Sequence, residues 1–381
     1  MALLFLLGSG TSVDAGMPRV DEISASVRSG EGVFLGSDAL YHVDPKNPNF
    51  GRLRAGAEPA IEFVQSLERL AAAYYRALDP TVRGVDYEEL AFLAGGIQRA
   101  VGLSQENPAL LPLIRELAGS GVDGNLRTVG DRAKHAWNYV RDVTRTMLDR
   151  PPTTTAHLAV VTEACRSMAS VDLFTLNHDL VLEAALGRAG IPFSDGFERT
   201  YGDIRIWNDI FSGNVRLLKL HGSISWWGYT LPHEEWRGYV TARVTNDDPF
   251  HARGVDGRLL PSPHDLRPIF LAGTFDKLFG YESWIFPDQH YRFHEALRAS
   301  TRLVVIGYGF RDQAINSRLI DWLTRSEENR MIVVHGDADQ IPIFARTAIQ
   351  NHWDAWVRRG RVRLVRSWVA DTPWGAVDAA L

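Results

Sequence analysis

The segment LLFLLGSGTS, residues 3–12, decides the fold of this chain of 381 residues. Its five consecutive apolar residues are typical of a strand buried on both faces, as the strands of parallel sheets are. Gly8 and Gly10 follow at once, at a strand-to-helix turn where a backbone without side chains can approach a phosphate. The dehydrogenase fingerprint would need a third glycine where Val13 stands, so this is not that motif. Taken alone, the two glycines suit either a phosphate-binding turn of another kind or a purely structural turn.

Six more short apolar runs carry a similar signature, because each is followed by glycine or a polar turn. Helical patterns lie between several of them, as over Thr155–Met168, Leu180–Ala189 and Tyr291–Ala299. This alternation of strand and helix predicts an α/β fold with a Rossmann-like, doubly wound parallel sheet. The further predicted strands are Val171–Thr175, Val215–Leu220, Ile269–Leu271, Leu303–Ile306, Met331–Val334 and Val362–Val365.

Residues 57–150 break the alternation with a series of helices. Apolar residues there repeat at helical spacing, as Ile61, Val64 and Leu67 do, and the pattern continues to residue 147. A stretch rich in Gly, Pro and Asn precedes this region, and Pro151-Pro152 ends it. We therefore expect a Rossmann domain made of residues 1–56 and 151–381, interrupted by a helical insertion of residues 57–150.

Composition narrows the function classes. The net charge of −5 at pH 7 argues against general attraction to nucleic acid. The single cysteine, Cys165, can form neither an intrachain disulfide nor a cysteine-rich zinc site. The apolar run 2–7 is too short for a signal core or a membrane span, and no later run is long enough. We expect a cytoplasmic protein without a membrane segment.

Two further patterns favour structural roles. His290 and His294 stand four apart on a predicted helix, as zinc ligands of zincins do, but Tyr291 occupies the place of the required glutamate. We expect no metal site. Trp226 and Trp227 suit packing in a core better than a nicotinamide pocket, because aromatic pairs are more often core.

Polar residues follow several of the predicted strands, at the edge where open α/β sheets bind ligands. Asn177 and Asp179 follow one strand, and His221 follows the next. Two interpretations compete for each, since Asn and Asp are also favoured helix caps and a lone histidine before glycine is commonly a turn residue. Gly307 and Gly309 likewise suit either a nucleotide or a tight turn.

Taken in order, these motifs resemble the nucleotide-binding elements of sirtuins. GSGTS at residues 8–12, with GMP at 16–18, is similar to the opening G-A-G-x-S…G-I-P element, and TLNHD at 175–179 is similar to T-Q-N-x-D. LHGS at 220–223 resembles the segment that bears the sirtuin catalytic histidine. GYGFRD at 307–312 resembles a later nucleotide-binding turn of bacterial sirtuin-like proteins. The match spans most of the α/β portion and leaves out the helical insertion.

The resemblance implies that NAD is the substrate and that Asn177 and His221 are catalytic. Asn177 would position the ribose and the attacking water, Asp179 would hold the carboxamide, and His221 would contact the ribose hydroxyls and act as general base. No metal is implied. The expected NAD-binding residues are Gly8, Ser9, Gly10, Thr11, Ser12, Pro18, Arg19, Asp179, Gly307, Tyr308, Gly309 and Phe310.

Some departures separate the chain from sirtuin deacylases. The two cysteine pairs that hold their zinc are absent, and Leu176 replaces the glutamine of T-Q-N. The usual arginine of G-I-P-D-F-R is out of register, although Arg19 follows Pro18. The pattern is closer to the sirtuin-like NADases of bacterial anti-phage defence, which implies an NAD hydrolase that releases nicotinamide and ADP-ribose. A non-catalytic NAD or ADP-ribose sensor and a zinc-free deacylase or ADP-ribosyltransferase are the alternatives.

An NAD hydrolase would poison its own cell unless it is gated. We expect a homo-oligomer that docks on a second protein; the resemblance favours a HerA-type DNA-translocating ATPase, with a short Argonaute as the alternative. The helical insertion is the expected contact surface, because it lies outside the catalytic resemblance; the alternative is that its helices cover one face of the sheet and bury their aromatic residues. Aromatic residues are a class enriched at interfaces, and the insertion carries six. These are Tyr74, Tyr75, Tyr87, Phe92, Trp137 and Tyr139.

Overall fold

The computed structural model describes residues 2–78, 84–102, 107–119, 126–232, 234–246, 248–271, 284–346 and 348–381. The chain divides into two compact units. The first consists of residues 1–17, 151–270 and 278–381, and most of the second is Pro18–Arg150. Each unit is described by itself.

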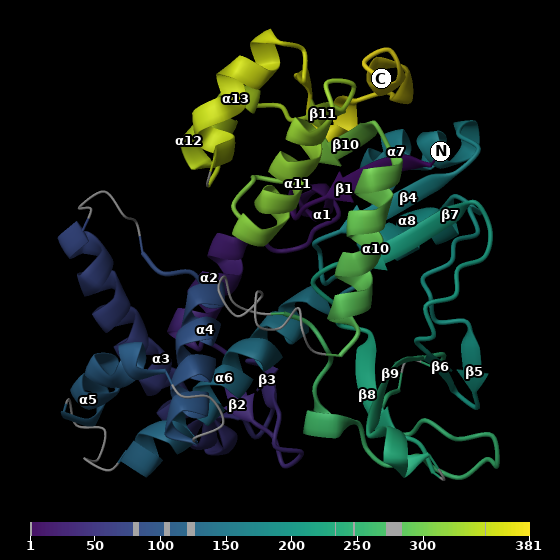
Figure 1. The fold of residues 1–381 in the computed structure, drawn as a ribbon. Helices are drawn as coiled ribbons and strands as arrows, with labels where there is room; N and C mark the ends of the chain where they lie inside the picture. The colour runs from purple at the N-terminus through teal and green to yellow at the C-terminus, as the bar shows by residue number, and fades with distance from the viewer. Residues whose placement is uncertain are drawn as a thin grey trace. The chain divides into compact units, whose positions relative to one another are not determined.

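A six-stranded parallel sheet forms the centre of the first unit (Figure 1). Its strand order is β12-β11-β10-β1-β4-β7, which in chain order is the 3-2-1-4-5-6 arrangement of Rossmann folds. The predicted fold class is therefore confirmed. The strands are β1 (Leu3–Leu7), β4 (Val171–Thr175), β7 (Val215–Lys219), β10 (Arg302–Ile306), β11 (Arg330–Val334) and β12 (Val362–Val365).

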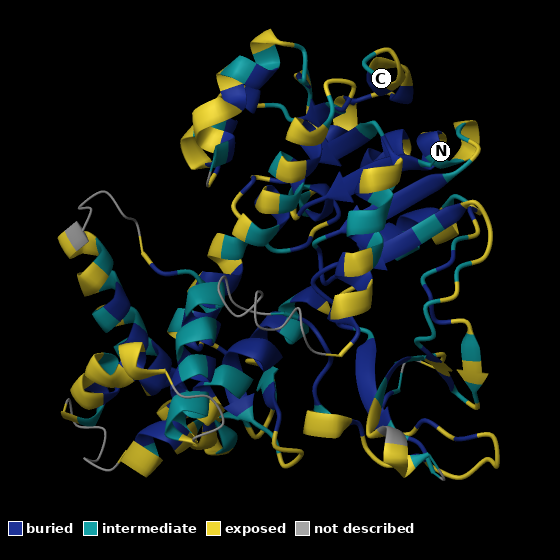
Figure 2. Cartoon of the chain, viewed as in Figure 1, coloured by how far each residue is buried: buried dark blue, intermediate teal, exposed yellow. Residues whose placement is uncertain are grey.

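Helices cover both faces of this sheet, which explains why its strands are apolar without alternation. Phe5 and Leu7 of β1 lie in one core, and Leu4 and Leu6 lie in the other. All four are buried, as the dark blue strands of Figure 2 show. The first core includes residues of α7 (Ala159–Ser167), α8 (Val181–Arg188) and α14 (Trp374–Asp378). The second includes residues of α10 (Phe286–Ala299), α11 (Gln313–Arg325), α12 (Ile341–Phe344) and α13 (Ala348–Arg358).

A second, antiparallel sheet in the first unit has no counterpart among the predicted elements. Its strand order is β5-β6-β9-β8, with bounds Arg199–Tyr201, Ile204–Ile206, Tyr239–Val244 and Trp226–Thr230 in that order. Trp227 and Tyr229 of β8 are buried in its own small core. The predicted strand at Ile269–Leu271 is wrong: Phe270 makes an isolated bridge to Gly222. The Ile269 amide donates to the carbonyl of Trp226 at the start of β8, but the segment joins neither sheet as a strand.

The second unit is mainly helical. Its elements are α2 (Val20–Ser29), β2 (Val33–Leu35), β3 (Tyr41–Val43), α3 (Phe50–Leu78), α4 (Tyr87–Val101), α5 (Leu111–Gly119) and α6 (Leu126–Leu148). It begins at Pro18, whereas the sequence pattern places the insertion at 57–150. The added residues pack on the helices: the Tyr139 hydroxyl donates to the Val27 carbonyl over 2.8 Å, and the Tyr41 amide donates to Asp142 over 2.9 Å.

The six aromatic residues of the insertion differ in exposure. Tyr87 and Tyr139 are buried in the unit, and Tyr75, Phe92 and Trp137 are partly buried. Tyr74 is 64% exposed. The contact surface stays a prediction, and Tyr74 is its most exposed aromatic residue.

The chain leaves and rejoins the first unit at adjacent points. The Thr153 amide donates a 2.9 Å hydrogen bond to the carbonyl of Ala15. Ala15 stands three residues before the second unit begins, and Thr153 stands three residues after Arg150. No helix among the described residues is both long and apolar enough to cross a membrane.

Candidate active site

Two glycine turns meet at the carboxyl ends of β1 and β10, the central pair of the sheet. The Gly8 amide donates to the Ile306 carbonyl and the Gly10 amide to the Gly307 carbonyl, both over 2.9 Å. A Cβ atom on Gly8 would stand 2.6 Å from the Gly307 oxygen, closer than any side-chain carbon can approach. Gly307 has a φ of +65°, which favours glycine. In the Rossmann strand order this is the point where the winding reverses and where ligands bind.

Asn177 follows β4 and joins that strand to the first turn. Its Nδ2 contacts the Gly8 carbonyl at 3.1 Å, Thr11 Oγ1 at 3.1 Å and Ser12 Oγ at 2.9 Å. Because a carbonyl can only accept, the Gly8 contact fixes which end of the amide faces the turn. The other end, Oδ1, is buried and has no hydrogen-bond partner in the described structure. Asn177 does not cap α8.

A buried charge cluster continues from this turn. The Asp179 carboxylate accepts from the Val181 amide over 3.0 Å, next to the start of α8, although the N-cap residue of that helix is Leu180. Burial raises the pKa of Asp179, while the Lys219 ammonium and hydrogen bonds from Val181 and Ser12 act in the opposite direction. Lys219 also donates to the Asp179 carbonyl and to Glu183 Oε1, the latter at 2.8 Å. Ser12 thus lies between Asn177 and Asp179.

His221 stands just beyond β7 and is 3% exposed. Its Nε2 lies 3.2 Å from Oδ2 of Asp312, whose side chain is also largely buried. The ring of His178 lies 6.3 Å from the His221 ring, centre to centre. The next residue, Gly222, has a φ of +84°, and a Cβ there would stand 2.4 Å from the Ile269 carbonyl oxygen. The interpretation of His221 as a turn residue bonded to backbone is less favoured than a paired imidazole.

His290 of α10 holds the residue that precedes His221. Its Nε2 lies 3.1 Å from the Leu220 carbonyl, to which it must donate. Burial lowers the pKa of His290 to about 3, with smaller contributions from His221 and Arg318. The ring therefore stays neutral near pH 7 and acts as a fixed donor to the end of β7.

The second glycine turn orients its side chains inward. The Tyr308 hydroxyl donates to Asn316 Oδ1 over 2.9 Å, and Phe310 is fully buried against Trp353 with ring centres 5.4 Å apart. Phe310 has a φ of +54°, and its carbonyl accepts from Asn316 Nδ2 over 2.7 Å. Any contact of Tyr308 or Phe310 with a nucleotide would therefore come mainly from backbone atoms.

The structure brings most of the predicted site residues to one edge of the sheet. Pro18 and Arg19 belong to the second unit, where the Arg19 amide donates to Glu22 at the start of α2, and their role in NAD binding stays a prediction. Trp226 and Trp227 are buried in β8, which agrees with packing in a core. The described residues contain no group of three or more His, Cys, Asp or Glu side chains arranged to hold a metal ion.

Sequence reasoning assigned no role to three residues of this edge: His178, Asp312 and His290. Asp312 ends the GYGFRD motif, and nothing in the local sequence connects it with His221. His178 stands between the two residues to which roles were assigned. The spacing of His290 and His294 points only to a zinc ligand, and nothing in the local sequence connects His290 with Leu220.

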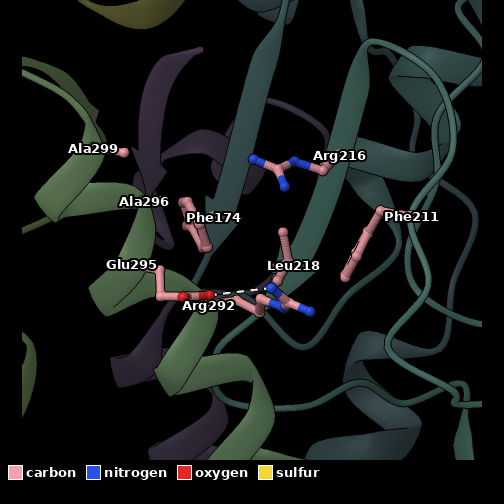
Figure 3. Close-up of a pocket in the computed structure, with 8 residues that line it drawn as sticks. All are labelled: Phe174, Phe211, Arg216, Leu218, Arg292, Glu295, Ala296 and Ala299. Carbon is pink, nitrogen blue, oxygen red and sulfur yellow. Dashed lines mark hydrogen bonds and ion pairs between the residues drawn. The ribbon is translucent and has the colours of Figure 1, made fainter. Parts of the chain in front are cut away.

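A cavity of about 280 Å³ lies elsewhere in the first unit, between α10 and the strands β4 and β7 (Figure 3). Its arginines are paired within the protein: Arg292 contacts Asp209 at 2.7 Å and Glu295 at 3.1 Å, and Arg216 contacts Asp172. None of its lining residues belongs to the predicted site. They are Phe174, Phe211, Arg216, Leu218, Arg292, Glu295, Ala296 and Ala299.

The fold and this polar edge define a Rossmann-type unit with two glycine turns at the edge where such sheets bind ligands. Within it, residues 171–353 match the family described as the SIR2-like domain. That range contains Asn177, His221 and the second glycine turn, and it omits the first. No curated protein matches the chain.

Solved structures similar to this chain include Sir2 homologues in complex with nucleotides. A serine-to-alanine mutant bound to ADP-ribose has a TM-score of 0.39 at 15% identity, covering 100% of this chain and 91% of that one. A Sir2 homologue in complex with NAD has a TM-score of 0.38 at 14% identity, covering 100% and 89%.

Proposed function

We propose that the first unit binds NAD at the carboxyl ends of β1, β4, β7 and β10 and hydrolyses the bond between nicotinamide and ribose. The products are nicotinamide and ADP-ribose. The motif resemblance and the SIR2-like match over residues 171–353 support this proposal, because that range contains Asn177, Asp179 and His221.

One observation carries the proposal. Asn177 uses its Nδ2 on three acceptors, while its buried Oδ1 has no partner. Leaving a buried acceptor unsatisfied costs about 1–3 kcal/mol, so an oxygen held this way is suited to a ligand. A ribose hydroxyl and a water molecule both donate, and both are present when NAD is hydrolysed.

The reaction needs few protein groups. Water attacks the anomeric carbon, the carbon–nitrogen bond breaks, and its electron pair returns to the pyridinium, which leaves as neutral nicotinamide. No acid is required for the leaving group, in contrast to ordinary glycosides. The water loses one proton, which His221 would accept as general base, a role that contributes about 10²–10⁴-fold.

Asp179 would bind the nicotinamide side of the bond that breaks. Carboxylate oxygens accept from amide N–H groups, so this side chain suits the nicotinamide carboxamide. Its ties to Val181 and Ser12 restrict its motion and would keep it in place during the reaction.

The alternatives predict different behaviour. A sensor would bind NAD and leave it intact, and a zinc-free deacylase or ADP-ribosyltransferase would need a second, protein substrate. The pairing of Asn177 and His221 with buried partners favours catalysis over sensing. The single cysteine cannot build the zinc module of sirtuin deacylases.

We further propose that the chain is the gated effector of a bacterial anti-phage system. The resemblance to sirtuin-like NADases supports this role, and free NADase activity would be toxic. Homo-oligomerisation and a HerA-type ATPase are the favoured means of control, with a short Argonaute as the alternative partner.

The test is chromatography of NAD incubated with the purified chain, alone and with the protein products of neighbouring genes. Equal amounts of nicotinamide and ADP-ribose are expected. NAD that binds but stays intact under every condition would support the sensor instead. Products that form only when an acylated peptide is added would support the deacylase.

A further inference from the structure

The His221–Asp312 contact joins two buried, ionisable side chains from distant parts of the chain. His221 follows β7, and Asp312 is the N-cap residue of α11. Their closest atoms, Nε2 and Oδ2, are 3.2 Å apart, and the two side chains are 4% and 10% exposed. Ion-pair contacts at this depth are only weakly screened by solvent.

The Asp312 carboxylate is itself held in place. Its Oδ1 accepts from the amides of Ala314 and Ile315 at 2.9 and 3.0 Å. These helix N-terminal amides favour the ionised carboxylate. The remaining oxygen, Oδ2, is the one that contacts His221. One oxygen of Asp312 therefore binds the start of α11, and the other contacts the imidazole.

We propose that Asp312 is the positioning residue for the His221 base: its carboxylate holds the imidazole in one orientation and in the tautomer that carries hydrogen on Nε2. The neutral ring then has its basic lone pair on Nδ1. The carboxylate also stabilises the imidazolium that forms when the ring takes a proton from water, as buried acids do for catalytic histidines. The role in turnover rests on the proposed NAD hydrolysis.

The pairing also links the base to the second glycine turn. Asp312 stands two residues after Phe310, whose carbonyl is held by Asn316 Nδ2 over 2.7 Å. The position of the carboxylate is therefore fixed by the same turn that is expected to contact the nucleotide.

Other charged groups near His221 do not replace Asp312. His178 and His290 are the titratable rings beside it, and Arg318 acts electrostatically on His290. None of these groups carries a negative charge, so none can stabilise a protonated His221 as a carboxylate does. Lys219, two residues earlier on β7, is also positive. Asp312 is the acid that makes a direct contact with the ring in the described structure.

The first test needs no catalysis. In ¹⁵N-histidine-labelled protein, the two ring nitrogens of His221 are assigned by the resonances that a His221→Gln variant lacks. Hydrogen on Nε2 in the neutral ring is expected in the wild-type chain, and hydrogen on Nδ1 would overturn the proposal. Failure of the chain to hydrolyse NAD would leave this result intact, so the two proposals fail separately.

The second test uses Asp312→Asn. Asparagine is an equally good N-cap, so α11 stays capped and the melting temperature changes little. The midpoint of the His221 titration should fall by about one pH unit or more, since an opposite charge in contact favours the charged form. In kinetics, kcat should fall at least about tenfold with KM unchanged, and the acidic limb of the pH profile should move to lower pH.

Asp321→Asn is the matched control. It removes the same charge from the same helix at an exposed position that pairs with Arg325. It should leave the His221 titration and kcat unchanged. An unmoved titration midpoint in Asp312→Asn, or an equal shift in both variants, would refute the role of Asp312.

Discussion

The amide of Gly10 donates a 2.9 Å hydrogen bond to the carbonyl of Gly307, so the two glycine turns of the Rossmann sheet are in direct backbone contact. One turn follows the first strand, and the other follows a strand some 300 residues later in the sequence. A Cβ atom on Gly10 or on Gly307 would collide with the backbone of the opposite turn, so both positions need glycine for the turns to lie this close.

Gly307→Ala should destabilise the chain and abolish nucleotide binding. Its Cβ would stand 2.6 Å from the Thr11 amide nitrogen at a positive φ, and strain plus overpacking cost about 2–4 kcal/mol. Gly309→Ala is the control, because open space surrounds a Cβ there. Thermal denaturation checks this prediction, and equal melting temperatures for both variants would contradict it.

Asn177→Ala and His221→Ala should each lower NAD turnover by about 10²-fold or more, because they remove the acceptor for water or ribose and the base. Asn177→Ala should also lower the melting temperature, since it breaks the bonds to Gly8, Thr11 and Ser12. The controls are Asn351→Ala and His352→Ala at exposed positions on α13. Losses of tenfold or less in both site variants would reject the assigned roles.

Acid should destabilise the wild-type chain partly through His290. Burial lowers the pKa of His290 from 6.5 to about 3, so between these values the unfolded chain binds the proton and the folded chain does not. Stability is thus lost as pH falls from about 6.5 towards 3, by at most about 5 kcal/mol for this group. In denaturant titrations at a series of pH values, the free energy of unfolding of His290→Gln should fall less steeply with decreasing pH than that of the wild type. The control His352→Gln, at an exposed position, should show the same pH dependence as the wild type. Parallel curves for wild type and His290→Gln would contradict the assignment.

Chelators should leave the chain folded and active. A structural zinc site contributes folding energy directly, and one cysteine cannot supply a thiolate set. Circular dichroism and NAD turnover in excess EDTA measure the effect. Elemental analysis that found one tightly bound zinc per chain would refute the expectation.

Tyr74→Glu should weaken assembly without changing NAD affinity. Tyr74 is 64% exposed on α3, and a charge there would oppose burial in an interface. Light scattering at micromolar concentration tests the expected oligomer, and co-purification tests the ATPase partner. Tyr291→Glu, at a 58% exposed position on α10, is the control. A monomeric wild-type chain, or normal assembly of Tyr74→Glu, would contradict the prediction that the surface of α3 around Tyr74 is an assembly interface.

The strands of the central sheet were predictable to within a residue or two because they are buried on both faces. β4 has the bounds that its apolar run indicates, and β1 does too. The antiparallel sheet was not predictable in the same way: β5 and β6 have three residues each, too few for a pattern to show. Ile269–Leu271 has a strand-like composition but packs on the loop at Gly222, a contact that only the folded chain reveals.

The site was predictable where its residues follow strands. Asn177 and His221 stand at strand ends, and parallel strands bring such positions to one edge. The partners were not predictable: Asp312 is far along the chain from His221, and His290 meets Leu220 through the packing of α10 on the sheet. The spacing of apolar residues predicts single helices and strands, but it does not predict which side chains of different elements come into contact.

The hydrogen bond between Thr153 and Ala15 has a consequence for the ancestry of the chain. A segment whose two ends leave a fold at neighbouring residues can be lengthened, shortened or exchanged without rerouting any strand, as domain insertions commonly are. The helical unit can then change in length or sequence while the strand order of the Rossmann unit stays the same. Related chains are expected to differ most in what stands between these two residues.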